Sequence, residues 1–83
     1  MHEMSLAMAI CQMAEDRLGV DALKQVTRVG LTVGDQSGVE LGSLEFCLDT
    51  LLAAPPFAGA KPVITRSTDD ALHLDYFEVD DAR

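Results

Sequence analysis

The chain has 83 residues, with 14 acidic against 6 basic side chains and a formal net charge of −8. This length predicts one domain over residues 1–83, near the low end of what a single hydrophobic core can support. The acidic balance argues against nucleic acid or an anionic membrane as a partner, because phosphate binding requires clustered basic side chains. It is compatible with a cation or a basic protein surface as partner, and also with solubility alone.

Residues 2–18 are predicted to form the first helix, and Gly19 is a natural stop signal after it. Apolar residues recur there at helical spacing: Leu6, Ile10, Met13, Ala14 and Leu18. Methionines also follow this spacing, at Met4, Met8 and Met13. Such a stripe can suggest a soft-metal site, but we interpret it as flexible filler of the core.

The first strand is predicted over residues 26–33, where Val29, Leu31 and Val33 alternate with residues of the opposite face. A short connection at residues 20–24 leads into this strand. Residues 34–38 form the turn that follows it. The turn ends in Ser37-Gly38-Val39-Glu40. This sequence fits a capping box, in which the serine hydroxyl accepts from a helix amide and the glutamate reaches back.

The second helix follows, and Pro55-Pro56 ends it because proline lacks an amide hydrogen. Its apolar stripe consists of Leu41, Leu44, Leu48, Leu51 and Leu52. A strand is predicted over residues 62–66, then a polar turn, then a last strand over residues 72–79. The alternation of the last strand changes phase after Tyr76, which indicates a bulge.

The order helix, strand, helix, strand, strand predicts an α+β fold of two layers. The strand–helix–strand unit favours a right-handed parallel crossover. The last two strands are close enough in sequence to form an antiparallel hairpin. We therefore expect a small mixed three-stranded sheet with both helices packed on one face, because so short a chain cannot cover two faces.

The two cysteines, Cys11 and Cys47, stand far apart and form no CxxC pair, so neither a zinc knuckle nor a thioredoxin-type site is available. We interpret them as buried free thiols. The chain opens without the basic cluster of a signal peptide, and no apolar run is long enough to span a bilayer. These features predict a soluble, cytoplasmic protein. No nucleophile with its base, phosphate loop or pair of catalytic carboxylates is found, so an enzyme is not expected.

The opening residues Met1-His2-Glu3 carry a candidate metal site. Methionine is expected to stay on a chain whose second residue is histidine, which leaves its α-amine as the terminus. That amine, the main-chain nitrogen of His2 and the His2 imidazole can surround one metal ion in fused chelate rings. Planar nitrogen donors suit Ni(II) or Cu(II). The alternative is that His2 merely opens the first helix and that Glu3 is a favourable carboxylate in its first turn.

Four stretches together resemble the HypA/HybF family of nickel metallochaperones for [NiFe]-hydrogenase maturation. They are Met1-His2-Glu3-Met4-Ser5-Leu6; residues 26–33 with the glycine turn 34–39; Leu44-Glu45-Phe46 with Leu51; and residues 72–79. The resemblance implies a Ni(II) site at Met1, His2 and Glu3. It also implies a nickel-enzyme precursor, such as the hydrogenase large subunit, and a maturation GTPase as partners.

One departure from the family is large. Members of the family carry a zinc-binding module with paired CxxC motifs between the last two strands, whereas this chain has only residues 66–71 there. The chain therefore resembles a variant without the zinc module, and no zinc is expected. The other histidine, His73, is interpreted as an ordinary strand residue, since a role as fourth ligand requires its strand to end near the N-terminus.

Two functions follow from these observations. The first is a nickel-binding metallochaperone that acts through its N-terminus. The second is a docking module that binds a metalloenzyme large subunit or a maturation partner and carries no metal. The opening Met1-His2-Glu3 favours the first, because a docking module has no evident need for it.

Overall fold

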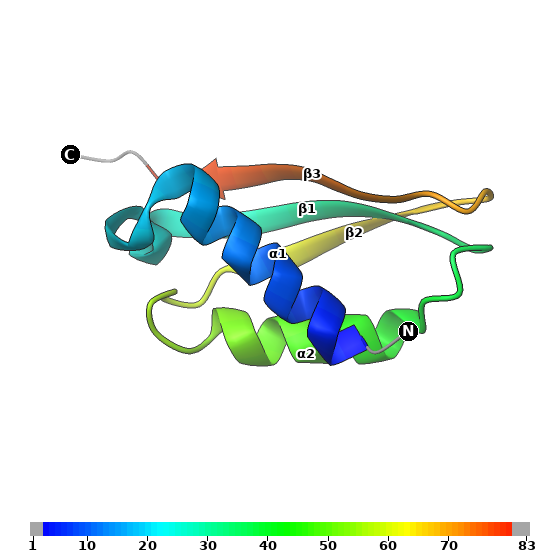
Figure 1. Cartoon of the computed structure of the whole chain (residues 1–83), viewed down its shortest axis with the longest axis horizontal. Helices are drawn as coiled ribbons and strands as arrows, with labels where there is room; N and C mark the ends of the chain where they lie inside the picture. Colours follow the sequence, from blue (N-terminus) through cyan, green and yellow to red (C-terminus); the bar gives the residue numbers. More distant parts are fainter. Residues whose placement is uncertain (1–2, 81–83) are drawn as a thin grey trace.

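The elements form in the order expected from the hydrophobic periodicity, with one short helix added. The computed structural model describes residues 3–80; Met1, His2 and residues 81–83 lie outside the described part. The elements are α1 (Glu3–Leu18), η1 (Val20–Gln25), β1 (Val26–Gly34), α2 (Leu41–Leu52), β2 (Lys61–Ser67) and β3 (Leu72–Val79) (Figure 1). The 3-10 helix η1 occupies the segment that was expected to be a plain connection.

The strands form one mixed sheet in the order β2-β1-β3. β1 and β2 are parallel, with Leu31 opposite Ile64, and α2 forms the crossover between them. β1 and β3 are antiparallel. Both helices lie on the same side of the sheet (Figure 1). The α+β class, the parallel crossover and the placement of both helices on one face are confirmed.

The expected hairpin between the last two strands is wrong. β2 and β3 lie on opposite sides of β1 and do not pair with each other. The reason is the apolar character of β1, in which Val29, Leu31 and Val33 are at most 3% exposed. A central position buries these side chains and gives both edges of the strand hydrogen-bonding partners, whereas a β2-β3 hairpin would leave one edge of β1 open.

The core joins α1, α2 and β1. Leu44, Leu48 and Leu52 of α2 are completely buried. In α1 the buried residues are Ala7, Ile10 and Ala14, while the methionines are exposed. The expectation that the methionines fill the core is therefore wrong. α1 packs most closely against α2, and the longer methionine side chains of α1 remain exposed.

The start of α2 differs from the predicted capping box. Glu40 itself is the N-cap, and its carboxylate accepts from the Gly42 amide at 3.2 Å and the Ser43 amide at 2.7 Å. Ser37 instead accepts from the Val39 amide at 3.3 Å. Gly38 has a φ of 81°, which no helical residue adopts, so the helix cannot begin at Ser37.

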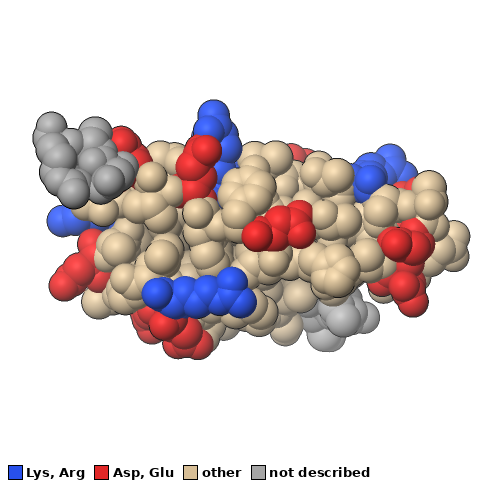
Figure 2. Space-filling model, turned by 90° about the horizontal axis from the view of Figure 1, so that it is seen from above, with Lys and Arg blue, Asp and Glu red and all other residues tan. Residues whose placement is uncertain are grey.

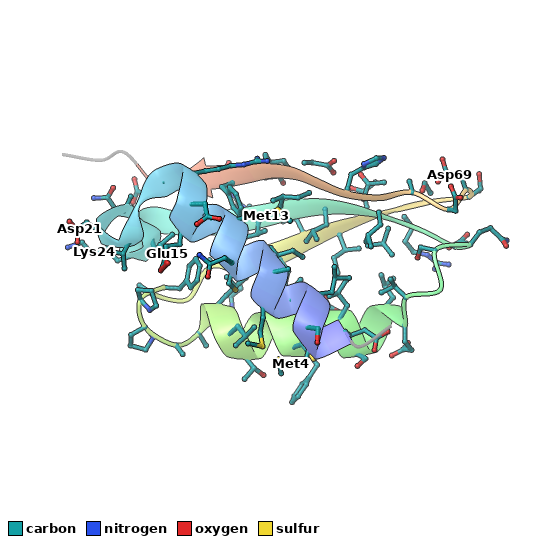
Figure 3. All side chains as sticks on the ribbon, viewed as in Figure 1. Met4, Met13, Glu15, Asp21, Lys24 and Asp69 are labelled. Atoms are coloured by element: carbon teal, nitrogen blue, oxygen red, sulfur yellow. The ribbon has the colours of Figure 1, made fainter. Side chains whose placement is uncertain are left out.

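The link between β2 and β3 crosses the end of β1 and is hydrogen-bonded to it. Gly34 donates its amide hydrogen to the Ala71 carbonyl at 2.7 Å, Asp35 to that of Ser67 at 2.8 Å, and Gln36 to that of Asp69 at 2.9 Å. Asp69, at the far end of the sheet in Figure 3, accepts from the Ser67 hydroxyl at 2.7 Å and the Ala71 amide at 3.0 Å. These bonds hold the pKa of the Asp69 carboxyl below its usual value, with the Ser67 bond as the largest cause.

The predicted bulge in β3 is present, but it lies earlier than expected. Gly30 is opposite Tyr76 and the next residue, Leu31, is opposite Leu74, so Asp75 is the extra residue. The Tyr76 ring lies directly over Gly30, where an added Cβ would come within 2.1 Å of the ring. Seen from the side of β3, acidic and basic side chains are dispersed over a largely uncharged surface (Figure 2).

Candidate functional site

Glu3 fixes the beginning of α1 against the beginning of α2. Its carboxylate oxygen Oε2 accepts a hydrogen bond from the Glu40 main-chain amide at 3.0 Å. Glu40 in turn caps α2, as described above. The two helices therefore start side by side, with Glu3 at the start of α1 beside the start of α2 (Figure 1). Of the three predicted site residues, Met1 and His2 lie outside the described part, and only Glu3 is placed.

The convergence of two helix starts has an electrostatic consequence. Each helix N-terminus carries a partial positive charge from its aligned peptide dipoles. Two such ends side by side disfavour a cation nearby. The carboxylates of Glu3 and Glu40 lie at these two ends and offset that partial charge. The electrostatic potential at the start of α1 is therefore less unfavourable for a metal ion than it would be at two uncapped helix ends.

His73 is not brought to this place. It lies near the start of β3, opposite Thr32, with an exposed side chain. A groove of about 120 Å³ between α1 and β3 includes His73, but its other lining residues are apolar. Among residues 3–80, no three His, Cys, Asp or Glu side chains lie close enough together to hold a metal ion. His73 thus fits the interpretation as an ordinary strand histidine.

The cysteines also have a structural explanation. Cys47 is buried in the core beside Leu44 and Leu48 of the same helix. Cys11 is only half-buried, so the expectation of a buried thiol holds for Cys47 and not fully for Cys11. Burial raises the pKa of the Cys11 thiol, which lowers its thiolate fraction near neutral pH.

Sequence reasoning missed the role of Glu40. The residue was assigned to a capping box with Ser37, whereas its carboxylate caps α2 and its amide hydrogen goes to Glu3. The available signal was its position immediately before the apolar stripe that starts at Leu41. Glutamate is an uncommon N-cap compared with serine or aspartate, which is why the serine was preferred.

The sequence can be compared with those of known proteins. Residues 1–71 match the sequence profile of a family described as "Hydrogenase/urease nickel incorporation, metallochaperone, hypA". The chain belongs to this HypA family. Residues 72–79, which resemble the returning strand of the family, lie beyond the matched stretch. No helix among residues 3–80 has the length and apolar composition needed to cross a membrane.

Individual relatives extend this result. The chain is 39% identical over 64 residues to hydrogenase maturation factor HypA of Chlorobaculum parvum, covering 77% of this chain and 57% of the relative. It is 41% identical over 61 residues to HypA of Albidiferax ferrireducens, covering 74% and 54%. With HypA of Prosthecochloris aestuarii it shares 31% identity over 72 residues, covering 87% and 64%. The matched region thus spans little more than half of the first two relatives.

Proposed function

We propose that this chain is a nickel metallochaperone that binds Ni(II) at its N-terminus and delivers it to the precursor of a nickel enzyme such as a [NiFe]-hydrogenase. The donors are the Met1 amine, the His2 imidazole and the main-chain nitrogens of His2 and Glu3. The observation that supports the proposal is the hydrogen bond from the Glu40 amide to the Glu3 carboxylate, which holds Glu3 at the paired helix starts. Membership in the HypA family supports nickel as the cargo.

The chemistry suits a carrier rather than an enzyme. Ni(II) must displace protons from the amine, from any protonated imidazole and from the amides that it binds, so its affinity rises with pH. An unperturbed α-amine titrates at about 7.7–8.0. Binding near neutral pH is therefore reversible, as release to a client requires. Nucleotide hydrolysis in this scheme comes from a separate maturation GTPase.

Replacement of His2 by alanine is expected to abolish stoichiometric Ni(II) binding. The substitution removes the imidazole and with it one of the fused chelate rings. The measurement is calorimetric titration of Ni(II) into untagged protein at about pH 7 and about pH 8, with tighter binding at the higher pH because a larger fraction of the amine is then deprotonated.

His73→Ala is the matched control, because it removes the same side chain from the exposed end of β3 and should leave binding unchanged. An N-terminal extension that converts the Met1 amine into an amide should weaken binding as His2→Ala does. Tight stoichiometric binding by both the His2→Ala and the extended protein would contradict the proposal.

Replacement of Glu3 by alanine should weaken Ni(II) binding while leaving every proposed donor atom present. The loss of the acceptor for the Glu40 amide frees the helix start and costs about 1 kcal/mol. The chelating segment then samples more conformations before it binds. The measurement is the same titration, combined with the amide NMR shift of Glu40. Glu45→Ala, on the solvent side of α2, is the control, and equal Kd values for the two variants would refute a positioning role for Glu3.

The exposed apolar surface of the helix layer, described below, favours a second candidate function, a docking module that carries no metal. The two functions differ in one assay. In a strain that depends on this protein for nickel-enzyme maturation, His2→Ala abolishes maturation under the metallochaperone proposal and is tolerated by a docking module.

A further inference from the structure

Four large apolar side chains are exposed on α1 and α2, and one of them, Met13, lines the groove toward β3. Of the other three, Met4 is 40% exposed, Met8 57% and Phe46 70%. Single exposed apolar residues are ordinary on protein surfaces, but several on adjoining elements are informative. These three come from the two helices that pack against each other, and none of them belongs to the proposed chelate.

Met4 and Met8 lie along the seam between the helices, and Phe46 extends the exposed apolar surface over α2. α1 and α2 start together at the Glu3–Glu40 contact and run in the same general direction (Figure 1). Met4 lies where α1 passes over α2 (Figure 3). Met8 follows it by four residues, which places the two on one side of α1. Phe46 lies two residues from the buried Leu44, which places it on the opposite side of α2, away from the core.

The seam continues into an apolar groove toward the C-terminal end of α2. This groove has a volume of about 200 Å³, and its lining includes Met8, Cys11, Glu15, Leu51, Pro56 and Phe57. Glu15 lies on the side of α1 above the loop that follows α2 (Figure 3). From Met4 to Glu15 the apolar surface extends about 16 Å, or three helical turns.

The surroundings of this surface are acidic. Residues 35–60, which include all of α2, contain no lysine or arginine, and their charged residues are Asp35, Glu40, Glu45 and Asp49. In α1 the acidic residues Glu3, Glu15 and Asp16 outnumber the single basic residue, Arg17. Gln12 at the groove donates to Glu15 at 3.3 Å and to Asp16 at 3.0 Å, which holds both carboxylates near the rim.

We propose that this seam surface, defined as Met4, Met8 and Phe46 with the groove at Cys11, Leu51 and Phe57, binds a basic amphipathic helix of a partner protein. An apolar strip of three turns matches the apolar face of such a helix, which docks by residues spaced three and four apart. Methionine side chains adapt their shape to the bound face. The acidic surroundings select lysine and arginine on the flanks of the partner and disfavour an acidic partner.

The inference goes beyond the proposed nickel function and can fail separately from it. Peptide binding at the seam is measured without nickel, and nickel binding at the N-terminus is measured without a partner. The seam nevertheless begins at Met4, one residue beyond the proposed chelate, so a partner helix held there would lie beside the cargo.

The test uses the whole chain and a synthetic 18-residue helical peptide, with leucines on one face and lysines on the other. A matched peptide carries glutamates in place of the lysines. The lysine peptide should bind, measured by fluorescence anisotropy, and should shift the amide NMR signals of Met8 and Phe46. The glutamate peptide should not bind. Raising the salt from about 50 mM to about 500 mM should weaken the interaction, because exposed charges are screened.

Variants locate the binding surface. Phe46→Ser and Met8→Gln should each weaken binding, by about tenfold for Phe46, because buried aromatic anchors dominate such interfaces. Both side chains are exposed, and circular dichroism checks that the variants fold. Val63→Thr, at an exposed position on β2, is the matched control and should bind like the parent.

Three results would overturn the proposal. The first is binding that Phe46→Ser and Met8→Gln leave unchanged, or NMR shifts centred on Val63 and Tyr76. The second is equal affinity for the two peptides. The third is a dimer of this chain that Phe46→Ser dissociates, since the seam would then belong to a second copy.

Discussion

Alanine in place of Gly34 is expected to lower the free energy of unfolding by about 3 kcal/mol, through overpacking against backbone atoms. An added Cβ would lie 2.1 Å from the Asp69 carbonyl oxygen and 2.7 Å from the Ala71 nitrogen. Neither atom can move alone, because Asp69 and Ala71 accept hydrogen bonds from Gln36 and Gly34. The link between β2 and β3 would have to detach from the end of β1. The measurement is urea denaturation followed by circular dichroism.

Gly42→Ala is the matched control for this prediction. Gly42 lies in the first turn of α2, and the nearest atoms to its added Cβ belong to Glu40 at 3.6 and 3.8 Å, which is ordinary contact. Alanine there should stabilise the protein by about 0.5 kcal/mol, because glycine has the lower helix propensity. If Gly34→Ala unfolded at the same urea concentration as the parent, the packing of the link against β1 would be disproved.

Leu48→Ala is expected to lower the free energy of unfolding by about 3 kcal/mol. Leu48 is completely buried in the layer between α2 and the sheet. The substitution removes its apolar contacts and leaves a cavity that the neighbouring leucines only partly fill. For a domain of this size the change corresponds to a melting temperature lower by roughly 15 °C. Differential scanning calorimetry measures it directly.

Phe46→Ala provides the comparison within the same helix. Phenylalanine is the larger side chain, but at 70% exposure it contributes little to the core. Its replacement should change the stability by less than about 0.5 kcal/mol. A loss as large as that of Leu48→Ala would mean that Phe46 is part of the folded core, and the seam surface would then lose its main anchor.

Much of the fold could be predicted because the elements have clear periodicities. The leucine stripe of α2 and the alternation in β1 each indicate one buried face, and both faces are buried as expected. The neighbour of β3 could not be predicted in the same way. Alternation shows that a segment is a strand with one apolar face, but it does not say which strand lies beside it. The strongly apolar β1 occupies the centre of the sheet. That position depends on the relative burial of all three strands, so it cannot be inferred from one strand alone.

Two wrong predictions, the capping box before α2 and the methionines of α1 as core residues, have equally local causes. The pattern Ser37-Gly38-Val39-Glu40 satisfies the capping rule, but the rule assumes a helical backbone at Gly38, where φ is 81°. The methionines follow the helical period, yet the buried residues of α1 are Ala7, Ile10 and Ala14. The predicted apolar stripe contains Ile10 and Ala14 but not Ala7, and it includes Met13, which is exposed.

The donor atoms of the candidate site could be predicted from the sequence, but the contact that positions Glu3 could not. The donor atoms of Met1, His2 and Glu3 follow from their adjacency in the sequence, and binding by them stays a prediction. The hydrogen bond between Glu3 and Glu40 joins residues 37 positions apart, and no local sequence pattern predicts it. Only the packing of α1 against α2 brings these two residues together.

In the strand order β2-β1-β3, the link between β2 and β3 starts on one side of β1 and ends on the other. β2 ends and β3 begins on either side of β1, so the chain leaves and re-enters the sheet about 10 Å apart, twice the spacing between neighbouring strands. Neither strand depends on the other for its ladder. The length of the segment between Ser67 and Leu72 therefore does not set the register of either strand pair, although the short link present here adds its own hydrogen bonds to residues 34–36 at the end of β1.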